Sequence, residues 1–234
     1  MEIKRLFKRR GGVDRIDSMK NLKIFLSGGG NEKQTVKLDN VFRSYLKKDK
    51  PLLYIPHAAN LNKFKRYYSW VSGVFKNLKI ELIRDLSKIK LEHLFSNFSG
   101  IYIGGGSTYK LKEIFIKTNF WDVLYSYALD GNPVYGGSAG ALILGKNISA
   151  CDGDRSKADI EEYSGLSLVK DYSMTCHFNG ALDLAKYKDI NKLIVLPEET
   201  GLFYDGTSFK AYGTKKAYFI NITTCNPRIN QSIL

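Results

Sequence analysis

Cysteine is scarce in this chain, and so are the patterns that usually give it a structural role. The 234 residues include three isolated cysteines, Cys151, Cys176 and Cys225, with no C-x-x-C spacing typical of zinc ligands. Three single cysteines also do not form the paired framework of a disulfide-rich secreted protein. We therefore expect no metal, no cofactor and no structural disulfide.

Long apolar runs are also missing. No segment approaches the roughly 20 apolar residues that a membrane helix needs. The N-terminus is basic and lacks the apolar run of a secretory signal. These absences predict a cytoplasmic protein with no membrane partner.

Acidic residues are in the minority: 36 Lys and Arg face 23 Asp and Glu, for a formal net charge of +13. Part of this excess lies in residues 1–20, where seven Lys or Arg face three acids, and we predict this segment to be a basic, mobile extension before a single α/β domain of residues 21–234. Other lysines, such as Lys110, Lys112 and Lys117, are spread along expected helices without the interleaved aromatics and arginines of a base-stacking surface. We expect no nucleic-acid partner.

Short apolar runs alternate with segments of helical spacing, as in Val36, Leu38, Val41, Phe42, Tyr45 and Leu46. This alternation predicts a mostly parallel sheet covered by helices on both faces, with closely spaced strands and a mixed or antiparallel edge after residue 193. The expected strands are Leu22–Ser27, Leu52–Pro56, Leu78–Ile83, Gly100–Ile103, Pro133–Tyr135, Ser173–His177, Leu193–Leu196, Leu202–Asp205 and Ala217–Ile222.

Three glycine clusters follow expected strands: Gly28–Gly30, Gly104–Gly106 and Gly136–Gly137. Ligands of parallel α/β sheets bind beyond the carboxyl ends of the strands. We therefore expect the three loops to meet at one rim.

The third cluster continues as Gly136-Gly137-Ser138-Ala139-Gly140, a G-x-S-x-G turn between an apolar strand and an apolar helix. Such a turn exposes a nucleophilic serine hydroxyl at the start of a helix. The alternative is that Ser138 only caps that helix.

A nucleophilic serine needs a base and a group that orients the base. Among the three histidines, His177 ends an expected strand and is favoured, His57 could reach the rim, and His93 is expected at the surface. Candidate carboxylates are Asp152 and Asp154 after the nucleophile helix and Glu198 and Glu199 after Leu193–Leu196. The amide of Ala139 and one from Gly104–Gly106 could stabilise an oxyanion, although the glycine run could also be a phosphate loop or a plain turn.

Several segments in order resemble the peptidase E (dipeptidase E) and cyanophycinase family of serine peptidases. They are Gly104-Gly105-Gly106-Ser107-Thr108, Gly137-Ser138-Ala139-Gly140-Ala141, Cys176-His177-Phe178 and Leu196-Pro197-Glu198, and the resemblance runs from about Leu22 to Asp205. It implies a three-layer fold similar to the class I glutamine amidotransferase domain and to flavodoxin, with a serine at the nucleophile elbow.

The resemblance also implies residue roles. Ser138 would be the nucleophile, His177 the general base, and Gly105 and Ala139 the oxyanion donors. The third member would be Glu198, with Asp152 as second choice. Gly106, Lys186 and Lys188 are candidate substrate contacts.

One departure concerns specificity. The family pattern has arginines between the histidine and the Leu-Pro-Glu segment that pair with an N-terminal aspartate. The basic residues of this segment in the present chain are all lysines, which lack the bidentate fork of arginine. The sequence therefore does not predict whether peptides that begin with aspartate are preferred.

The resulting expectation is a serine peptidase, an exopeptidase or dipeptidase acting on short peptides as a monomer or homodimer. The alternatives are a non-peptide amidase or esterase, or an inactive homologue that binds a peptide or metabolite. Gly140–Asn147 nearly matches a P-loop, but Asn147 replaces the Ser or Thr that contacts magnesium. A lipase-like α/β-hydrolase is disfavoured because only 96 residues follow Ser138.

Overall fold

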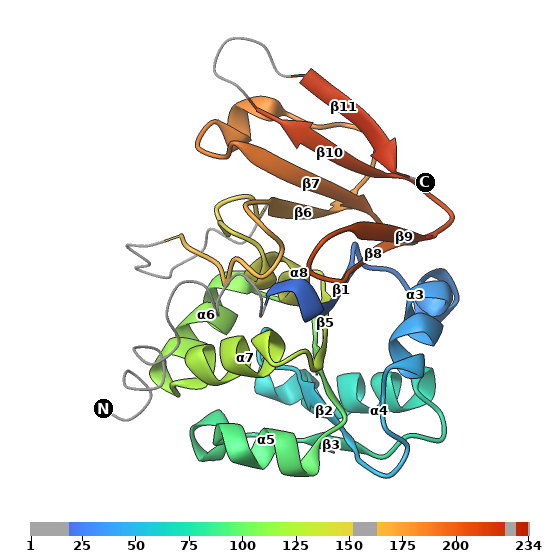
Figure 1. The fold of residues 1–234 in the computed structure, drawn as a ribbon, viewed down its shortest axis with the longest axis vertical. Coiled ribbons are helices and arrows are strands. Elements are labelled where there is room, and N and C mark those ends of the chain that lie inside the picture. Colours follow the sequence, from blue (N-terminus) through green and yellow to red (C-terminus); the bar gives the residue numbers. More distant parts are fainter. Residues whose placement is uncertain (1–18, 152–162, 223–227, 234) are drawn as a thin grey trace.

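The structure, a computed structural model, describes residues 19–151 and 163–222, and the backbone of residues 228–233 (Figure 1). Its main element is a seven-stranded sheet of order β3-β2-β4-β5-β1-β8-β9. The first five strands in this order are parallel, and β8 and β9 form an antiparallel edge. The strands are β1 (Lys23–Ser27), β2 (Leu52–Ile55), β3 (Ile80–Leu82), β4 (Gly100–Ile103), β5 (Pro133–Gly137), β8 (Thr200–Tyr204) and β9 (Phe209–Gly213).

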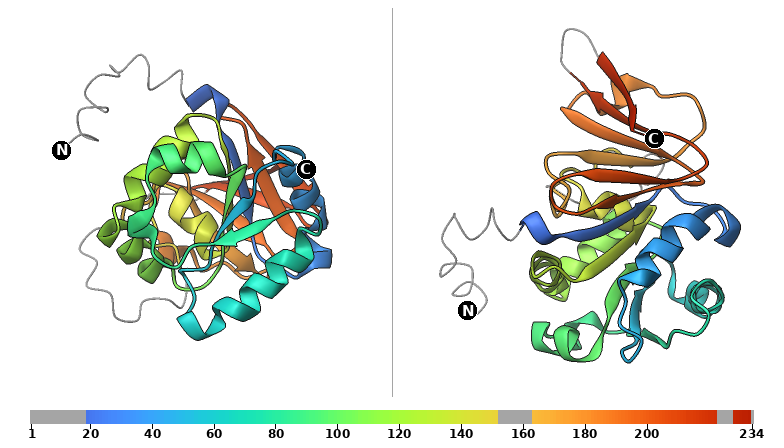
Figure 2. Two further views of the ribbon diagram at one scale, coloured as in Figure 1. Left: turned by 90° about the horizontal axis from the view of Figure 1, so that it is seen from below. Right: turned by 45° about the vertical axis from the view of Figure 1, so that its right-hand side comes forward.

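Helices cover both faces of this sheet (Figures 1 and 2). On one face lie α3 (Glu32–Ser44) and α4 (Phe64–Val74), and on the other α5 (Leu91–Asn97), α6 (Thr108–Lys117), α7 (Phe120–Leu129) and α8 (Ala139–Leu144). Short 3-10 turns are η1 (Met19–Asn21), η2 (Leu61–Lys63), η3 (Leu86–Lys88) and η4 (Leu184–Tyr187). The α/β three-layer fold predicted from the sequence is confirmed.

Alternate residues of the strands explain the two apolar layers. Ile24 and Leu26 in β1 pack among α5 to α8, whereas Phe25 between them packs against α3 and α4. Ile101 and Ile103 in β4 likewise face one layer and Tyr102 the other. Because side chains of a strand alternate between faces, a sheet covered on both sides needs apolar residues at every position.

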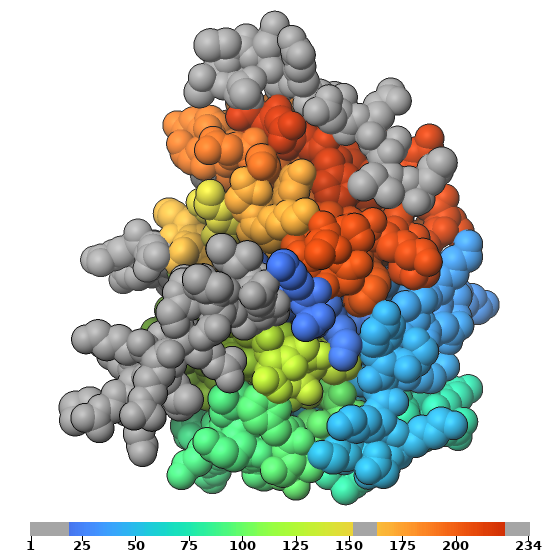
Figure 3. Space-filling view, viewed as in Figure 1, coloured from blue at the N-terminus to red at the C-terminus, as the bar shows by residue number. Residues whose placement is uncertain are grey.

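A second sheet of four strands, in the order β11-β10-β7-β6, lies above the first in Figure 1. Its strands are β6 (Ser173–Phe178), β7 (Lys192–Pro197), β10 (Ala217–Asn221) and β11 (Arg228–Ile233). β6 and β7 are parallel, and β10 pairs antiparallel with β7 and β11. In the space-filling view the orange and red residues, which include β8 and β9 of the first sheet as well as β7 and β10 of the second, lie above the blue and green residues (Figure 3).

The expected strands are present within a few residues of their predicted bounds, and so is the antiparallel edge. β9 and β11 were not predicted. The predicted 1–20 extension needs a correction at its end: Met19 and Lys20 begin η1, and the carbonyl of Met19 lies so close to Gly206 that a Cβ there would be 1.8 Å away. Residues 1–18 lie outside the described part of the chain.

None of the helices among the described residues combines the length and the apolar character needed to cross a bilayer. Cys176 is a free thiol, and Cys225 lies outside the described residues.

Candidate active site

Ser138 lies at the sharp turn between β5 and α8, with φ 50 and ψ −112. Gly136 and Gly140, two residues before and two after Ser138, are required because the backbone packs closely around them. A Cβ on Gly136 would lie 2.3 Å from the carbonyl oxygen of Gly140, and one on Gly140 would lie 2.4 Å from that of Ile103. The Ser138 side chain makes no capping hydrogen bond to α8, so the alternative of a simple helix cap is wrong.

The Ser138 hydroxyl instead contacts His177. Oγ and Nε2 are 2.7 Å apart, which is hydrogen-bond distance. The backbone of His177 has φ 58, and its N–H donates to the carbonyl of Gly28 at 3.0 Å. Gly29 lies against the imidazole, since a Cβ there would be 2.4 Å from Cε1. The glycine loop after β1 therefore supports the imidazole.

The other ring nitrogen of His177 contacts Glu198. Nδ1 is 2.9 Å from Oε1 of this glutamate, which lies in the turn between β7 and β8. The side chains of His177 and Glu198 are 51% and 47% exposed, so solutes can reach the pair. Serine, histidine and glutamate thus form one chain of hydrogen bonds, with the serine from one sheet and the histidine from the other.

The loop after β4 completes the surroundings of Ser138. A Cβ on Gly105 would lie 3.2 Å from Cβ of Ser138, so the loop passes directly beside the serine. Ala139 is the first residue of α8, where backbone N–H groups have no acceptor within the helix. The two predicted oxyanion residues therefore flank Ser138, and the three glycine loops meet at one rim as predicted.

A cavity of about 510 Å³ opens beside Ser138 and His177. Gly106 and Lys186, two predicted substrate contacts, line it together with Asp183. Its remaining lining is mixed: Thr108, Ala139, Leu142, Cys151, Thr175, Cys176, Phe178, Asn179, Ala181, Leu182 and Tyr187. Pockets for small ligands have this size and this mixture of apolar surface with a few polar groups.

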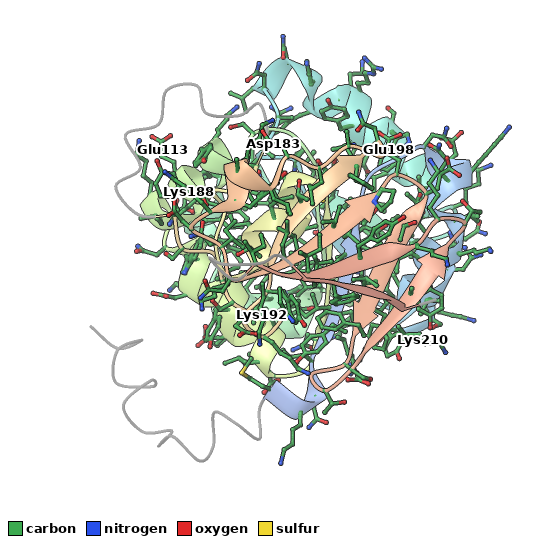
Figure 4. All side chains as sticks on the ribbon, turned by 90° about the horizontal axis from the view of Figure 1, so that it is seen from above. Glu113, Asp183, Lys188, Lys192, Glu198 and Lys210 are labelled. Atoms are coloured by element: carbon green, nitrogen blue, oxygen red, sulfur yellow. The ribbon has the colours of Figure 1, made fainter. Side chains whose placement is uncertain are left out.

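Lys188, the third predicted contact, does not line this cavity. It lies on the opposite side of Figure 4 from Glu198, with Asp183 between them in that view. Lys188 is therefore not placed to contact a substrate in this cavity.

The other histidines are apart from this chain of bonds. His57 is 4% exposed and does not line the cavity. Its Nε2 lies 3.0 Å from the carbonyl oxygen of Arg84, and burial lowers the pKa of its imidazole. His93 is exposed on α5, as expected. Asp152 and Asp154, the alternative carboxylates, lie outside the described residues.

Cys176 is next to His177 and lines the cavity, but its chemistry does not make it a nucleophile. Burial raises the pKa of its thiol to about 12, so the thiol is protonated near neutral pH. Because the thiolate is the reactive form, Ser138 is the better nucleophile of the two.

Much of the cavity wall was missed from the sequence. Phe178, Leu182, Asp183 and Tyr187 belong to the segment that directly follows His177. Their position after a candidate base is the one signal that could have identified them.

Comparison with known proteins supports one family. The model of peptidase family S51 matches residues 24–212. Peptidase E of Shewanella denitrificans is 23% identical over 186 residues, 74% of this chain and 78% of the relative. Peptidase E of Nostoc sp. is 25% identical over 184 residues, 72% of this chain and 75% of the relative.

Solved structures show the same fold. A Listeria monocytogenes EGD-e protein named after peptidase E has a TM-score of 0.66 at 22% identity, covering 83% of this chain and 99% of that one. A peptidase from an acI-B1 Actinobacterium has a TM-score of 0.69 at 18% identity, covering 90% and 96%. Since the family model spans most of the chain, this protein belongs to peptidase family S51.

Proposed function

We propose that the protein hydrolyses dipeptides or other short peptides through an acyl-enzyme on Ser138. The observation that carries this proposal is the continuous chain from Ser138 Oγ through His177 to Glu198, at 2.7 and 2.9 Å, beside an open cavity. Membership of a serine peptidase family supports the same chemistry.

In the proposed first step, Ser138 Oγ attacks the carbonyl carbon of the scissile peptide bond. His177 Nε2 takes the hydroxyl proton and then gives it to the leaving amine. Glu198 accepts a hydrogen bond from Nδ1–H, which holds the imidazole in the tautomer that leaves Nε2 free to accept the proton. Water then attacks the acyl-enzyme by the same route.

The negative oxygen of the tetrahedral intermediate would be stabilised by the amides of Ala139 and Gly105. Fixed backbone donors of this kind contribute most where charge develops, and each is worth roughly a hundredfold in rate or more. The positions of both residues beside Ser138 support this assignment.

The substrate would bind in the 510 Å³ cavity, where Gly106 and Lys186 are proposed contacts. The cavity carries a carboxylate on Asp183 and an ammonium group on Lys186. A zwitterionic short peptide has matching groups of both signs.

The test is hydrolysis of a panel of dipeptides and short peptides that vary at the first residue, with wild type beside Ser138→Ala and His177→Gln. We expect cleavage by wild type and a loss of roughly a thousandfold or more in each variant. Labelling of Ser138 by a fluorophosphonate without cleavage of any peptide would point to a non-peptide amide or ester substrate. Absence of both reactions would contradict the proposal and favour a binding protein.

A further inference from the structure

Glu198 is followed by a second glutamate, and the two carboxylates have different surroundings. Glu198 faces His177, whereas Glu199 faces away from it toward three other groups. Oε1 of Glu199 accepts a hydrogen bond from the Gln34 amide at 3.1 Å and lies 3.2 Å from the Lys215 ammonium. Oε2 accepts one from the Thr214 hydroxyl at 2.8 Å. These bonds, that from Thr214 foremost, lower the pKa of the Glu199 carboxyl and keep it ionised.

The three partners of Glu199 belong to two different parts of the scaffold. Gln34 lies in the first turn of α3, and its own Oε1 closes a capping box by accepting from the N–H of Asn31 at 2.8 Å. Thr214 and Lys215 lie in the connection between β9 and β10, which passes from the seven-stranded to the four-stranded sheet. The turn with Glu198 and Glu199, between β7 and β8, passes between the same two sheets.

The backbone around Glu199 is tied to the loop that supports His177. Its N–H points at the carbonyl of Gly29 at 3.4 Å, and its carbonyl accepts from Thr214 at 3.0 Å. Glu199 also has a left-handed φ of 69, a conformation that is costly for a residue with a side chain. A Cβ on Gly213 would lie 2.0 Å from the Glu199 carbonyl oxygen, so the backbones of the two segments pack closely here.

From these contacts we propose that Glu199 is a positioning residue that holds the Glu198 carboxylate on His177. The inference rests on the proposed function of Ser138, His177 and Glu198. The Glu199 carboxylate is bonded to α3 and to the β9–β10 connection, and these bonds hold the β7–β8 turn in its observed conformation. The Glu199 side chain then contacts the scaffold, while the Glu198 side chain contacts the imidazole of His177.

A double-mutant cycle separates this role from a general effect on folding. The variants are Glu199→Ala, Glu198→Ala and the double variant, and the readouts are the rate of Ser138 labelling by a fluorophosphonate and peptide hydrolysis. We expect Glu199→Ala to lower the labelling rate and kcat about tenfold to a hundredfold, with KM changed less than about twofold. In the Glu198→Ala background, Glu199→Ala should lower the labelling rate and kcat by less than about twofold, because the effects of residues that act as a unit are not additive. An equal loss in both backgrounds would overturn the proposal.

A second variant keeps the test decisive where Glu199→Ala does not fold. Thr214→Val removes one hydrogen bond to the carboxylate and should lower the labelling rate about threefold, again only while Glu198 is present. Glu113→Ala is the matched control for Glu199→Ala, because it also removes an ion-paired carboxylate, here one bonded to Lys117 on α6. The control should label at the wild-type rate.

A spectroscopic readout distinguishes failure of the inference from failure of the proposed function. Nitrogen-15 shifts of the imidazole report which ring nitrogen carries the proton, and the chain has only three histidines to assign. We expect the Nδ1–H tautomer of His177 in wild type and a mixture of tautomers in Glu199→Ala. If wild type labels but cleaves no peptide, the peptide substrate is wrong while the inference still stands on the labelling rates. If the His177 tautomer is the same in both proteins, the inference is wrong whatever the activity.

Discussion

At the scale of single residues, Ser138 and His177 share an uncommon feature. Both have a positive φ, 50 and 58, although neither is a glycine. Such a backbone costs of order 1–3 kcal/mol and persists only where surrounding contacts over-determine it. Here the amides of both residues are held, by the carbonyls of Ser27 and Gly28 respectively, each at 3.0 Å. The end of β1 and the loop after it therefore hold the backbones of both residues.

Gly29→Ala tests the space that this loop leaves for the imidazole. Its φ is +104 and the added methyl group would lie 2.4 Å from Cε1 of His177, so the ring has to shift from its hydrogen-bonded position beside Ser138. We expect a loss of activity of at least about a hundredfold, since misplacement of a reacting group by about 1 Å costs that much. The measurement is peptide hydrolysis or fluorophosphonate labelling.

Gly73→Ala is the matched control for this substitution. Gly73 lies within α4, and a Cβ there has no atom within 4 Å. The control should retain full activity and gain about 1 kcal/mol in the free energy of unfolding, because alanine is the better helix former. Equal activity of the two variants would show that Gly29 does not constrain His177.

The sequence identified residues best where few candidates existed. With three histidines in the chain, placement at a strand end was enough to select His177, and the G-x-S-x-G turn selected Ser138. Glu198 and Glu199 are adjacent and chemically the same, so their different partners could not be read from the sequence. The partners of Glu199 come from α3, 165 residues away along the chain, and from the β9–β10 connection, where Thr214 is 15 residues away.

At the scale of elements, α3 shows that apolar periodicity predicts a helix but not the burial of each of its residues. The apolar spacing correctly predicted a helix, yet Val36 is 45% exposed and the acidic Asp39 is 2% exposed. Asp39 is tolerated in the core because Thr35 and Tyr135 donate to its carboxylate at 2.7 and 2.9 Å. Tyr135 belongs to β5, 96 residues away, so no local pattern could reveal the pair.

The strand β9 was missed for a related reason. Phe209-Lys210-Ala211-Tyr212-Gly213 is short, lies at the edge of the sheet and is only partly buried. Its apolar content is therefore too low for the continuous run that marks a central strand. It is specified by pairing with β8, from Thr200↔Gly213 to Tyr204↔Phe209.

Asp39 predicts a pH dependence of stability. Burial raises the pKa of its carboxyl from 3.8 to about 6, against the opposing effect of the two hydrogen bonds. Between these values the folded protein binds more protons than the unfolded chain, so the free energy of unfolding falls as pH rises through about 4 to 6. This carboxyl therefore favours the folded state most below pH 4.

Asp39→Asn removes this titration. Relative to the variant, wild type should lose up to about 3 kcal/mol of unfolding free energy between pH 4 and pH 7, from about 1.4 kcal/mol for each pKa unit. Urea denaturation of both proteins at the two pH values measures the difference. Parallel pH profiles would mean that the buried carboxyl is not neutralised on folding.

At the scale of the whole molecule, the proposed site lies at the junction of two sheets. Ser138 follows β5 of the larger sheet, His177 lies in β6 of the smaller, and Glu198 is in a connection between them. Contacts of this kind join segments that are distant in sequence, and a larger share of such contacts slows folding. The geometry of the site therefore depends on correct docking of the two sheets.

Refolding from denaturant should separate the formation of secondary structure from the formation of the site. We expect far-UV circular dichroism to recover before Ser138 can be labelled by a fluorophosphonate, because labelling needs His177 docked from the second sheet. Both signals are followed after the same dilution from urea, with the fraction labelled measured at each time. Simultaneous recovery would show that the two sheets form in one cooperative step.

The order of the site residues along the chain has a consequence for protein synthesis. A ribosome makes Ser138 first, His177 39 residues later, and Glu198 another 21 residues later. The partners of Glu199 at Thr214 and Lys215 are translated later still. Throughout this interval the nascent chain carries the Ser138 hydroxyl without the two side chains that complete its chain of hydrogen bonds, so the proposed activity can begin only after Glu198 has been translated.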